Sequence, residues 1–130
     1  MNFTMSELLK SDTATKNKIK NIPTDPKVLD NMLELIVNVL QPLRDKLKKP
    51  IIITSGYRCK NLNTLVGGAS NSQHLYGQAA DFVVPNMTVK QVFDFVKNSG
   101  IEYDQLINEY NQWTHISFSK SHNRKDAFKL

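Results

Sequence analysis

The chain has 130 residues, of which 40% are hydrophobic, so it is long enough to bury a core of its own as one domain spanning residues 1–130. Its only cysteine, Cys59, excludes an intramolecular disulfide and favours a reducing compartment. No apolar run approaches the roughly 20 residues needed to cross a bilayer, and the N-terminus lacks the apolar core of a signal peptide. We therefore expect a soluble protein that is made in the cytoplasm.

A net charge of +5 raises the question of an anionic partner. The positive residues are spread over three separate segments, at 16–20, 44–49 and 120–129. None of these segments interleaves basic and aromatic residues, and the chain has no Cys/His zinc-finger spacing. We expect solvated surface lysines and no nucleic-acid partner. The alternative is an anionic cell-wall polymer, which a general positive field attracts without a motif.

The N-terminal third is predicted to contain two helices joined by a loop. Residues 4–10 have the pattern of a short helix capped by a hydroxyl side chain. The polar segment 11–26 contains two prolines and is expected to be mostly loop, with at most one helical turn. Residues 26–41 carry apolar side chains at spacings of three and four, which predicts an amphipathic helix. Pro42 lacks an N–H, so we expect this helix to kink or end there.

Short strands are predicted in the remainder of the chain. The candidate strands lie at 51–54, 79–84, 105–107 and 115–118, and the last two are expected to form a hairpin. The stretch 55–73 is rich in Gly, Ser and Asn and predicts a long irregular loop, which in a compact domain is often functional. A second amphipathic helix is expected between Thr88 and Gly100. This order predicts an α+β fold, in which a small antiparallel sheet packs against amphipathic helices.

Two histidines and one aspartate are candidate metal ligands. His74 offers a neutral imidazole nitrogen and Asp81 an anionic oxygen, but the six residues between them do not place both on one helix face. A loop that reverses through Gly77 would bring them together, and His115 on a later strand would supply the third donor. Two histidines and one carboxylate leave an open position on zinc, as in catalytic sites. On spacing alone, an ordinary His–Asp hydrogen bond is the simpler interpretation.

A longer string of residues extends this pattern. It comprises Ser55-Gly56-Tyr57-Arg58, Asn63, Val66-Gly67-Gly68-Ala69-Ser70-Asn71-Ser72-Gln73-His74, Ala79-Ala80-Asp81 and Trp113-Thr114-His115-Ile116-Ser117. Together with the pieces at 6–8, 11–14 and 40–44, it makes the chain resemble metallopeptidase family fifteen, M15, over about residues 3–119. This family contains zinc D-alanyl-D-alanine carboxypeptidases and phage endolysins that cut peptidoglycan, and the chain is most similar to its short single-domain subgroup. The SxHxxGxAxD form between Ser72 and Asp81 is a specific motif.

The resemblance implies a zinc ion held by His74, Asp81 and His115, on a sheet like that of the D-Ala-D-Ala peptidases and the hedgehog domain. It also implies that Arg58 binds substrate near the metal. A guanidinium can pair with a carboxylate or stabilise a developing oxyanion there. For Arg58 the alternative is a structural ion pair with an aspartate or glutamate.

Further residues of the string have weaker assignments. Ser72 either orients the substrate or holds a loop carbonyl, and Tyr57 either lines the cleft or packs, with packing favoured. Gly67 and Gly68 are expected to adopt positive φ. His122, in the polar C-terminal tail, is expected to be a solvated surface residue.

The general base departs from the common family pattern. Many members carry Glu-x-x-His, but the position three residues before His115 is Gln112, which accepts no proton at ordinary pH. Glu109 lies six residues before His115 and follows a Leu-Ile strand, an order that resembles the short subgroup. Glu109 is therefore the expected base, which takes a proton from the attacking water. The alternatives are Asp104, Glu102 or an inactive site.

Together these residues predict a zinc peptidase that hydrolyses a bond in peptidoglycan stem peptides or cross-links, of carboxypeptidase or endolysin type. The alternative is a catalytically inactive, zinc-containing cell-wall-binding module on the same fold, similar in kind to the hedgehog signalling domain. Gln112 is the residue that keeps this alternative open. We expect a monomer that reaches the cell wall after phage-type release or as a virion-associated protein.

Overall fold

The computed structural model describes residues 2–130, and a five-stranded sheet of order β1-β2-β4-β3-β5 lies at its centre. The strands are β1 (Ile52–Ser55), β2 (Ala79–Val83), β3 (Gln105–Glu109), β4 (Trp113–Ser117) and β5 (Asp126–Lys129). The pairs β1–β2, β2–β4 and β3–β4 are antiparallel, whereas β5 runs parallel to β3 at one edge. The predicted α+β class is confirmed, with one parallel pair added to the predicted antiparallel sheet.

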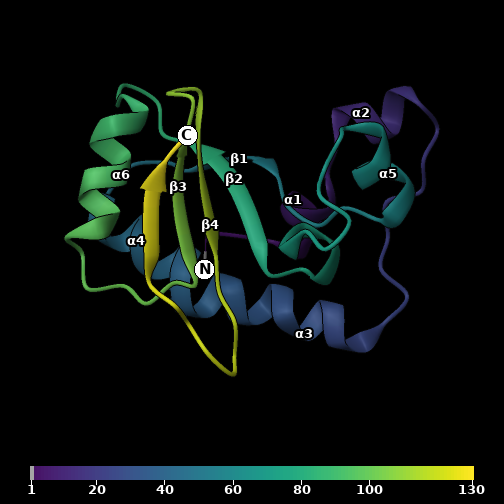
Figure 1. Ribbon diagram of the computed structural model, residues 1–130, viewed down its shortest axis with the longest axis horizontal. Coiled ribbons are helices and arrows are strands. Elements are labelled where there is room, and N and C mark those ends of the chain that lie inside the picture. The colour runs from purple at the N-terminus through teal and green to yellow at the C-terminus, as the bar shows by residue number, and fades with distance from the viewer. Residues whose placement is uncertain (1) are drawn as a thin grey trace.

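Along the chain, every helix among residues 2–130 precedes β1 or lies between β1 and β3 (Figure 1). They are α1 (Met5–Leu9), α2 (Asp12–Lys16), α3 (Pro26–Leu35), the π-helical η1 (Ile36–Leu40), α4 (Gln41–Leu47), α5 (Lys60–Leu65), the 3-10 turn η2 (Gln73–Tyr76) and α6 (Val89–Lys97). Figure 1 shows α6 beside the β3–β5 edge, while α1, α2 and α5 gather at the opposite end of the molecule. No helix in the described part of the chain is both long and apolar enough to cross a membrane.

One face of the sheet packs on helices to form the hydrophobic core. Its strand residues are Ala80, Phe82, Leu106 and Ile116, and its helix residues include Leu35, Ile36, Val39, Leu40, Leu43, Val92 and Val96. Successive side chains of a strand point to opposite faces. Asp81 and His115 each neighbour a core residue along the strand, so their side chains point to the face away from this core.

The helix predicted at 26–41 begins at Pro26 but does not end at Pro42. It continues without a break through η1 and α4 as far as Leu47. In η1 the helix widens by one residue, since the Gln41 N–H bonds to the Ile36 carbonyl five residues earlier. Pro42 then falls in the first turn of α4, where its ring is tolerated. Of the two outcomes predicted at Pro42, an end of the helix was wrong, because the π-helical turn before the proline accommodates the N–H that proline lacks. A kink at this position stays a prediction.

Three elements were not predicted, and one of them is η2, the turn that carries His74. The expected loop 55–73 contains α5, whose start has no side-chain cap and whose Leu62 is buried, so tertiary packing rather than local sequence stabilises it. The tail expected to be polar contains β5, a four-residue edge strand that pairs with β3. Four residues are too few to show a clear alternation of polar and apolar side chains.

The shorter helices follow the predicted caps. Thr4 caps α1 in a capping box with Glu7, and Thr88 caps α6 in the same way with Gln91. The single turn allowed within 11–26 is α2. These helix starts are local features of the sequence, since in each one the N-cap side chain accepts a hydrogen bond from the backbone N–H three residues later.

Candidate metal centre

His74, Asp81 and His115 converge on one point on the face of the sheet away from the core. Asp81 in β2 and His115 in β4 are direct cross-strand partners, and His74 lies in η2, the turn that leads into β2. All three side chains are buried, and one potential ligand atom of each lies within 4.8 Å of the other two. The structure therefore brings the three donors together, a question that their spacing in the sequence did not decide.

Asp81 Oδ1 lies between the two imidazoles. It is 2.9 Å from His115 Nδ1 and 3.3 Å from His74 Nε2. Burial raises the pKa of Asp81, but hydrogen bonds with His115 and His74 and the attraction of their charges outweigh burial, so the pKa falls well below its usual range. Asp81 is thus an ionised oxygen donor, which offsets part of the charge of a bound divalent cation.

The His74 ring is oriented from behind by a backbone carbonyl. His74 Nδ1 donates to the Gly56 carbonyl oxygen at 2.7 Å, which directs the other ring nitrogen, Nε2, to the cluster. Such an outer hydrogen bond is the usual way in which a metal-binding histidine is fixed in one tautomer. A Cβ on Gly56 would lie 2.4 Å from the Leu8 carbonyl oxygen, so α1 packs directly on this support. The N-terminal helix therefore contributes to the position of His74.

The turn around His74 is closed by Ser72 and Gly77. The Ser72 hydroxyl accepts from the His74 N–H at 3.2 Å and caps η2. Gly77 has φ of +72°, and a Cβ there would lie 2.6 Å from the Val28 carbonyl oxygen. The predicted reversal through Gly77 is confirmed, and the Ser72 side chain holds the loop. A contact between Ser72 and substrate stays a prediction.

Arg58 lies against the outer oxygen of Asp81. Its Nη2 is 3.3 Å from Asp81 Oδ2, its Nη1 donates to Asn63 Oδ1 at 3.2 Å, and its Nε donates to Ser55 Oγ at 3.0 Å. Among the described residues these bonds use three of the five guanidinium N–H groups, so two are left for a ligand. The structural ion pair considered as an alternative is therefore present, and it is compatible with a substrate contact.

A cleft of about 470 Å³ opens beside Arg58 and Asp81. Other residues that line it include Asp12 of α2, Thr54 of β1, Leu62 of α5 and Trp113 of β4. Of the three cluster residues, Asp81 lines this cleft, which therefore borders the cluster on the α2–α5 side. Tyr57, by contrast, packs against the hydrophobic core, which is the favoured interpretation for this residue.

Glu109 is the carboxylate next to the cluster. It is the last residue of β3, and its Oε1 lies 4.0 Å from His115 Nδ1 with 21% of the side chain exposed. Burial raises the pKa of Glu109, and the negative charge of Asp81 adds to this, while His115, His74 and Arg58 oppose it. The net effect is a raised pKa, which is typical of a carboxylate that both accepts and returns a proton.

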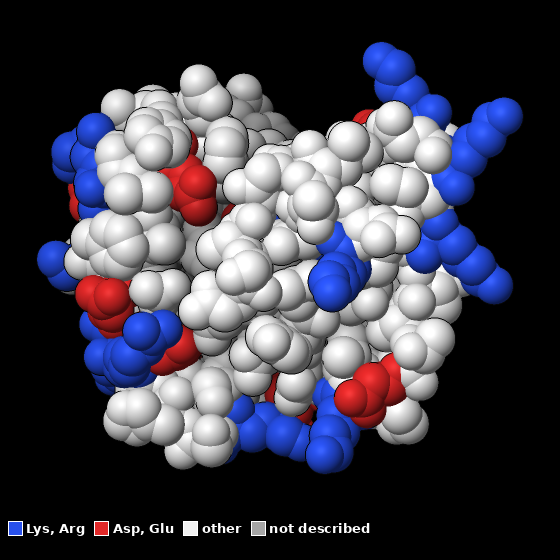
Figure 2. All heavy atoms as spheres, turned by 45° about the vertical axis from the view of Figure 1, so that its right-hand side comes forward, with Lys and Arg blue, Asp and Glu red and all other residues white. Residues whose placement is uncertain are grey.

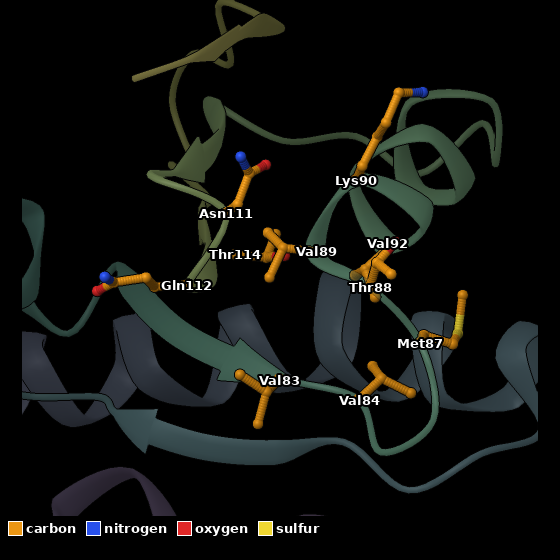
Figure 3. A pocket seen from close by; sticks show the side chains of 10 residues that line it. All are labelled: Val83, Val84, Met87, Thr88, Val89, Lys90, Val92, Asn111, Gln112 and Thr114. Carbon is orange, nitrogen blue, oxygen red and sulfur yellow. The ribbon is translucent and has the colours of Figure 1, made fainter.

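The position of the common family base and the two alternative carboxylates lie elsewhere. Gln112 is exposed and lines a different cleft, of about 570 Å³, between α6 and the β3–β4 turn (Figure 3). In Figure 3 its amide points away from the other lining side chains. Asp104 is bound by Arg124, whose hydrogen bonds hold the pKa of Asp104 at about 2, and Glu102 is exposed. Of the carboxylates considered, Glu109 therefore has the position of a base.

The glycine pair of the motif has two different roles. Gly67 has φ of +74°, as predicted, whereas the prediction of positive φ for Gly68 was wrong. Gly68 is needed for space: a Cβ there would lie 2.1 Å from Asn63 Oδ1, the atom that accepts from Arg58. Sequence analysis had no signal for this role, because a close approach to a side-chain amide leaves no pattern in the chain.

Charged side chains are dispersed over the surface. On the face shown in Figure 2, most Lys and Arg side chains lie around the outline, and several project at its right edge. His122 is exposed, as predicted for the C-terminal tail. Cys59 is half-buried at the start of α5 and is not one of the cluster residues.

Comparison with known proteins agrees with this geometry. The sequence profile of the family Peptidase M15 matches residues 1–117. The chain belongs to the peptidase M15 family. The zinc D-Ala-D-Ala carboxypeptidase of Streptomyces albus G is 36% identical to it over 83 residues, which are 62% of this chain and 31% of the relative. The chain thus spans less than a third of the length of this curated relative, and the family predicted from the motif string is confirmed.

The donor set fits zinc. Two imidazole nitrogens and one carboxylate oxygen are zinc ligands, and three protein donors with an adjacent cleft are the arrangement of catalytic sites. A closed structural site typically uses cysteine thiolates, and the single cysteine of the chain lies outside the cluster. The residues present therefore suit a catalytic metal.

Proposed function

We propose that this chain is a zinc peptidase that hydrolyses a peptide bond in peptidoglycan stem peptides or cross-links, of carboxypeptidase or endolysin type. The observation that carries the proposal is the convergence of the buried donors of His74, Asp81 and His115 beside an open cleft, in a chain of the M15 peptidase family. The name of the curated relative, a zinc D-Ala-D-Ala carboxypeptidase, supports both the metal and the substrate class.

His74 Nε2, Asp81 Oδ1 and His115 Nδ1 are the atoms that would hold the ion. When bound, zinc supplies a Lewis acid that polarises a carbonyl and lowers the pKa of water. The protein itself orients the three ligand side chains. The Gly56 carbonyl fixes the His74 ring, and the β2–β4 register fixes Asp81 opposite His115.

Glu109 is the proposed general base. Its carboxylate takes a proton from the attacking water and then donates that proton to the leaving nitrogen of the cleaved peptide. The raised pKa of Glu109 suits both steps, since it makes the carboxylate a better proton acceptor and keeps the proton available for return. Its position 4.0 Å from His115 Nδ1 supports this role, because a proton transfer to Glu109 would occur beside the cluster.

Arg58 is the proposed electrostatic partner of the substrate. Its bonds to Asp81, Asn63 and Ser55 hold the guanidinium rigidly at the wall of the cleft. The two remaining N–H groups are suited to the oxyanion that develops on the scissile carbonyl, or to a substrate carboxylate. A preorganised donor of this kind stabilises charge without reorganisation during the reaction.

The alternative of an inactive cell-wall-binding module was based on Gln112. Gln112 lines a separate cleft, whereas Glu109 lies beside the cluster, and this favours the enzyme. The decisive experiment is incubation of zinc-loaded protein with purified peptidoglycan, followed by mass-spectrometric identification of the released muropeptides. Release of single D-alanine indicates a carboxypeptidase, and larger products indicate an endopeptidase. No release above that of a peptidoglycan sample incubated without protein, from any peptidoglycan, would contradict the enzyme and favour the binding module.

A further inference from the structure

A buried carboxylate connects the C-terminal segment of the chain to the turn that carries His74. Asp104, just before β3, accepts two parallel hydrogen bonds from the Arg124 guanidinium, Nε to Oδ1 at 2.8 Å and Nη2 to Oδ2 at 2.9 Å. The Arg124 backbone N–H donates to the same Oδ1 at 2.9 Å. Paired bonds of this kind fix both the distance and the orientation of a carboxylate.

Gln73 is the residue that Asp104 holds on its other side. Gln73 Nε2 donates to Asp104 Oδ2 at 2.9 Å, while the buried Gln73 Oε1 has no hydrogen-bond partner among residues 2–130. The position of this side chain therefore depends on Asp104. Gln73 is the first residue of η2 and immediately precedes His74. Its carbonyl also accepts from the Gln78 N–H at 3.0 Å, which ties the turn to the start of β2.

The sheet makes Asp104 a fixed anchor. Its N–H donates to the Ser117 carbonyl at 2.8 Å, and its carbonyl accepts from the Asp126 N–H at 3.0 Å. Only 6% of its side chain is exposed, so without Arg124 the carboxylate would be buried with no cation beside it. Such a group either takes up a proton or turns toward solvent. Protonation leaves Gln73 Nε2 with only a neutral and weaker acceptor, and a turn toward solvent removes the acceptor altogether.

We propose that Arg124 is a positioning residue for the metal centre, which acts through Asp104 and Gln73 to hold the backbone of His74. The inference rests on the proposed zinc site. Arg124 lies beyond residue 117, where the family match ends. The unmatched C-terminal segment thus supports the donor cluster as well as adding the edge strand β5. His74 is then held from two directions, by Gly56 on its ring and by Gln73 on its backbone.

The zinc dissociation constant, measured by competition with a chromophoric chelator, tests this directly and needs no substrate. Arg124→Gln and Gln73→Met should each weaken zinc binding by about tenfold, the lower end of the effect of removing an outer partner of a metal ligand. The double variant should bind no more weakly than the weaker of the two single variants, because both changes break the same path. Arg124→Lys keeps the charge but not the paired bonds, so its affinity should fall between wild type and Arg124→Gln.

Lys120→Ala is the matched control, since it removes another ion pair of the same C-terminal segment, to Asp30 of α3. It should leave the zinc constant unchanged. Thermal unfolding of the metal-free variants verifies that each one folds. Equal zinc constants for wild type, Arg124→Gln and Gln73→Met, or multiplicative effects in the double variant, would overturn the positioning role alone. A wild-type chain that binds no zinc would overturn the proposed function as well.

Discussion

Asp81 and His115 face each other across the β2–β4 ladder, with His115 Nδ1 2.9 Å from Asp81 Oδ1. Their neighbours Phe82 and Ile116 are fully buried in the core. A slip of one residue in this register would move Phe82 and Ile116 out of the core, so the packing that stabilises the sheet also fixes the pair. Two of the three donors are therefore set by the fold, whereas His74 depends on the turn η2 and its supports.

The ligand assignment predicts that His74→Ala and Asp81→Ala each lose stoichiometric zinc. Two donors are too few to hold the ion tightly, and each substitution removes one of three. Metal content after gel filtration, measured by mass spectrometry, is the readout. His122→Ala is the matched control, because His122 is an exposed histidine of the C-terminal tail and its loss should leave the zinc content unchanged. Full retention of metal in both ligand variants would refute this donor set.

Glu109→Gln should keep zinc and abolish hydrolysis. The amide has the same shape as the carboxylate but accepts no proton, so a fall in kcat of roughly 10²- to 10⁴-fold is expected, the usual contribution of a general base. The measurement is product release from peptidoglycan at matched zinc content. Gln112→Ala should retain the wild-type rate, since Gln112 lines the cleft between α6 and the β3–β4 turn. Unchanged activity of Glu109→Gln would assign the base elsewhere, and loss of activity in Gln112→Ala would place that residue in the site.

The helix predictions that the structure confirms were based on apolar periodicity and on local capping patterns. The apolar spacing of 26–41 and the caps at Thr4 and Thr88 depend only on residues a few positions apart. Helices begin at these places in the structure. The donors were found as a set only through the motif string, because the cross-strand contact of Asp81 with His115 spans 34 residues of sequence. Contacts at that separation depend on register, which single-sequence spacing does not encode.

The features that were missed all depend on tertiary contacts. α5 has no side-chain cap and forms where Leu62 packs, and β5 forms because β3 offers it an unpaired edge. The role of Gly68 follows from its distance to Asn63, and that of Arg124 from a bond to Asp104. These tertiary contacts join residues that are more than one helical turn apart and follow no regular spacing. A search for periodic patterns in the sequence therefore does not detect them.

Gly68→Ala should impair the site without unfolding the protein. The added methyl would lie 2.1 Å from Asn63 Oδ1 and 3.0 Å from Arg58 Nη1, so it must displace the amide and the guanidinium that it holds. If Arg58 stabilises the oxyanion, kcat should fall by roughly tenfold or more, toward the loss seen when an oxyanion donor is removed. Steady-state kinetics at matched zinc content measures this.

Gly67→Ala is the contrasting variant. Nothing lies within 4 Å of its added Cβ, but its φ of +74° is unfavourable for alanine. It should lose about 1–2 kcal/mol of stability, the cost of a left-handed conformation, with kcat unchanged. Equal effects of the two substitutions on kcat would show that the loop tolerates the Gly68 methyl and that Arg58 keeps its place.

Asp104 should make the metal-free protein sensitive to acid. Its hydrogen bonds with Arg124 lower the pKa to about 2 from the ordinary value of 3.8. The ionised form is thus favoured in the folded state. The resulting stability is fully present above pH 3.8 and is lost as the pH falls through about 2. Because Arg124 is half exposed, solvent screening reduces the contribution to about 1 kcal/mol.

Urea unfolding of metal-free wild-type and Asp104→Asn protein between pH 6 and pH 2 isolates this contribution. Asp81 also has a lowered pKa and destabilises both proteins alike at low pH, so only the difference between them reports on Asp104. That difference in unfolding free energy should be largest at pH 6 and should shrink toward pH 2, where the Asp104 carboxylate takes up a proton and resembles the neutral amide. A difference that is constant over this range would mean that the Arg124 pair does not stabilise the charge of Asp104.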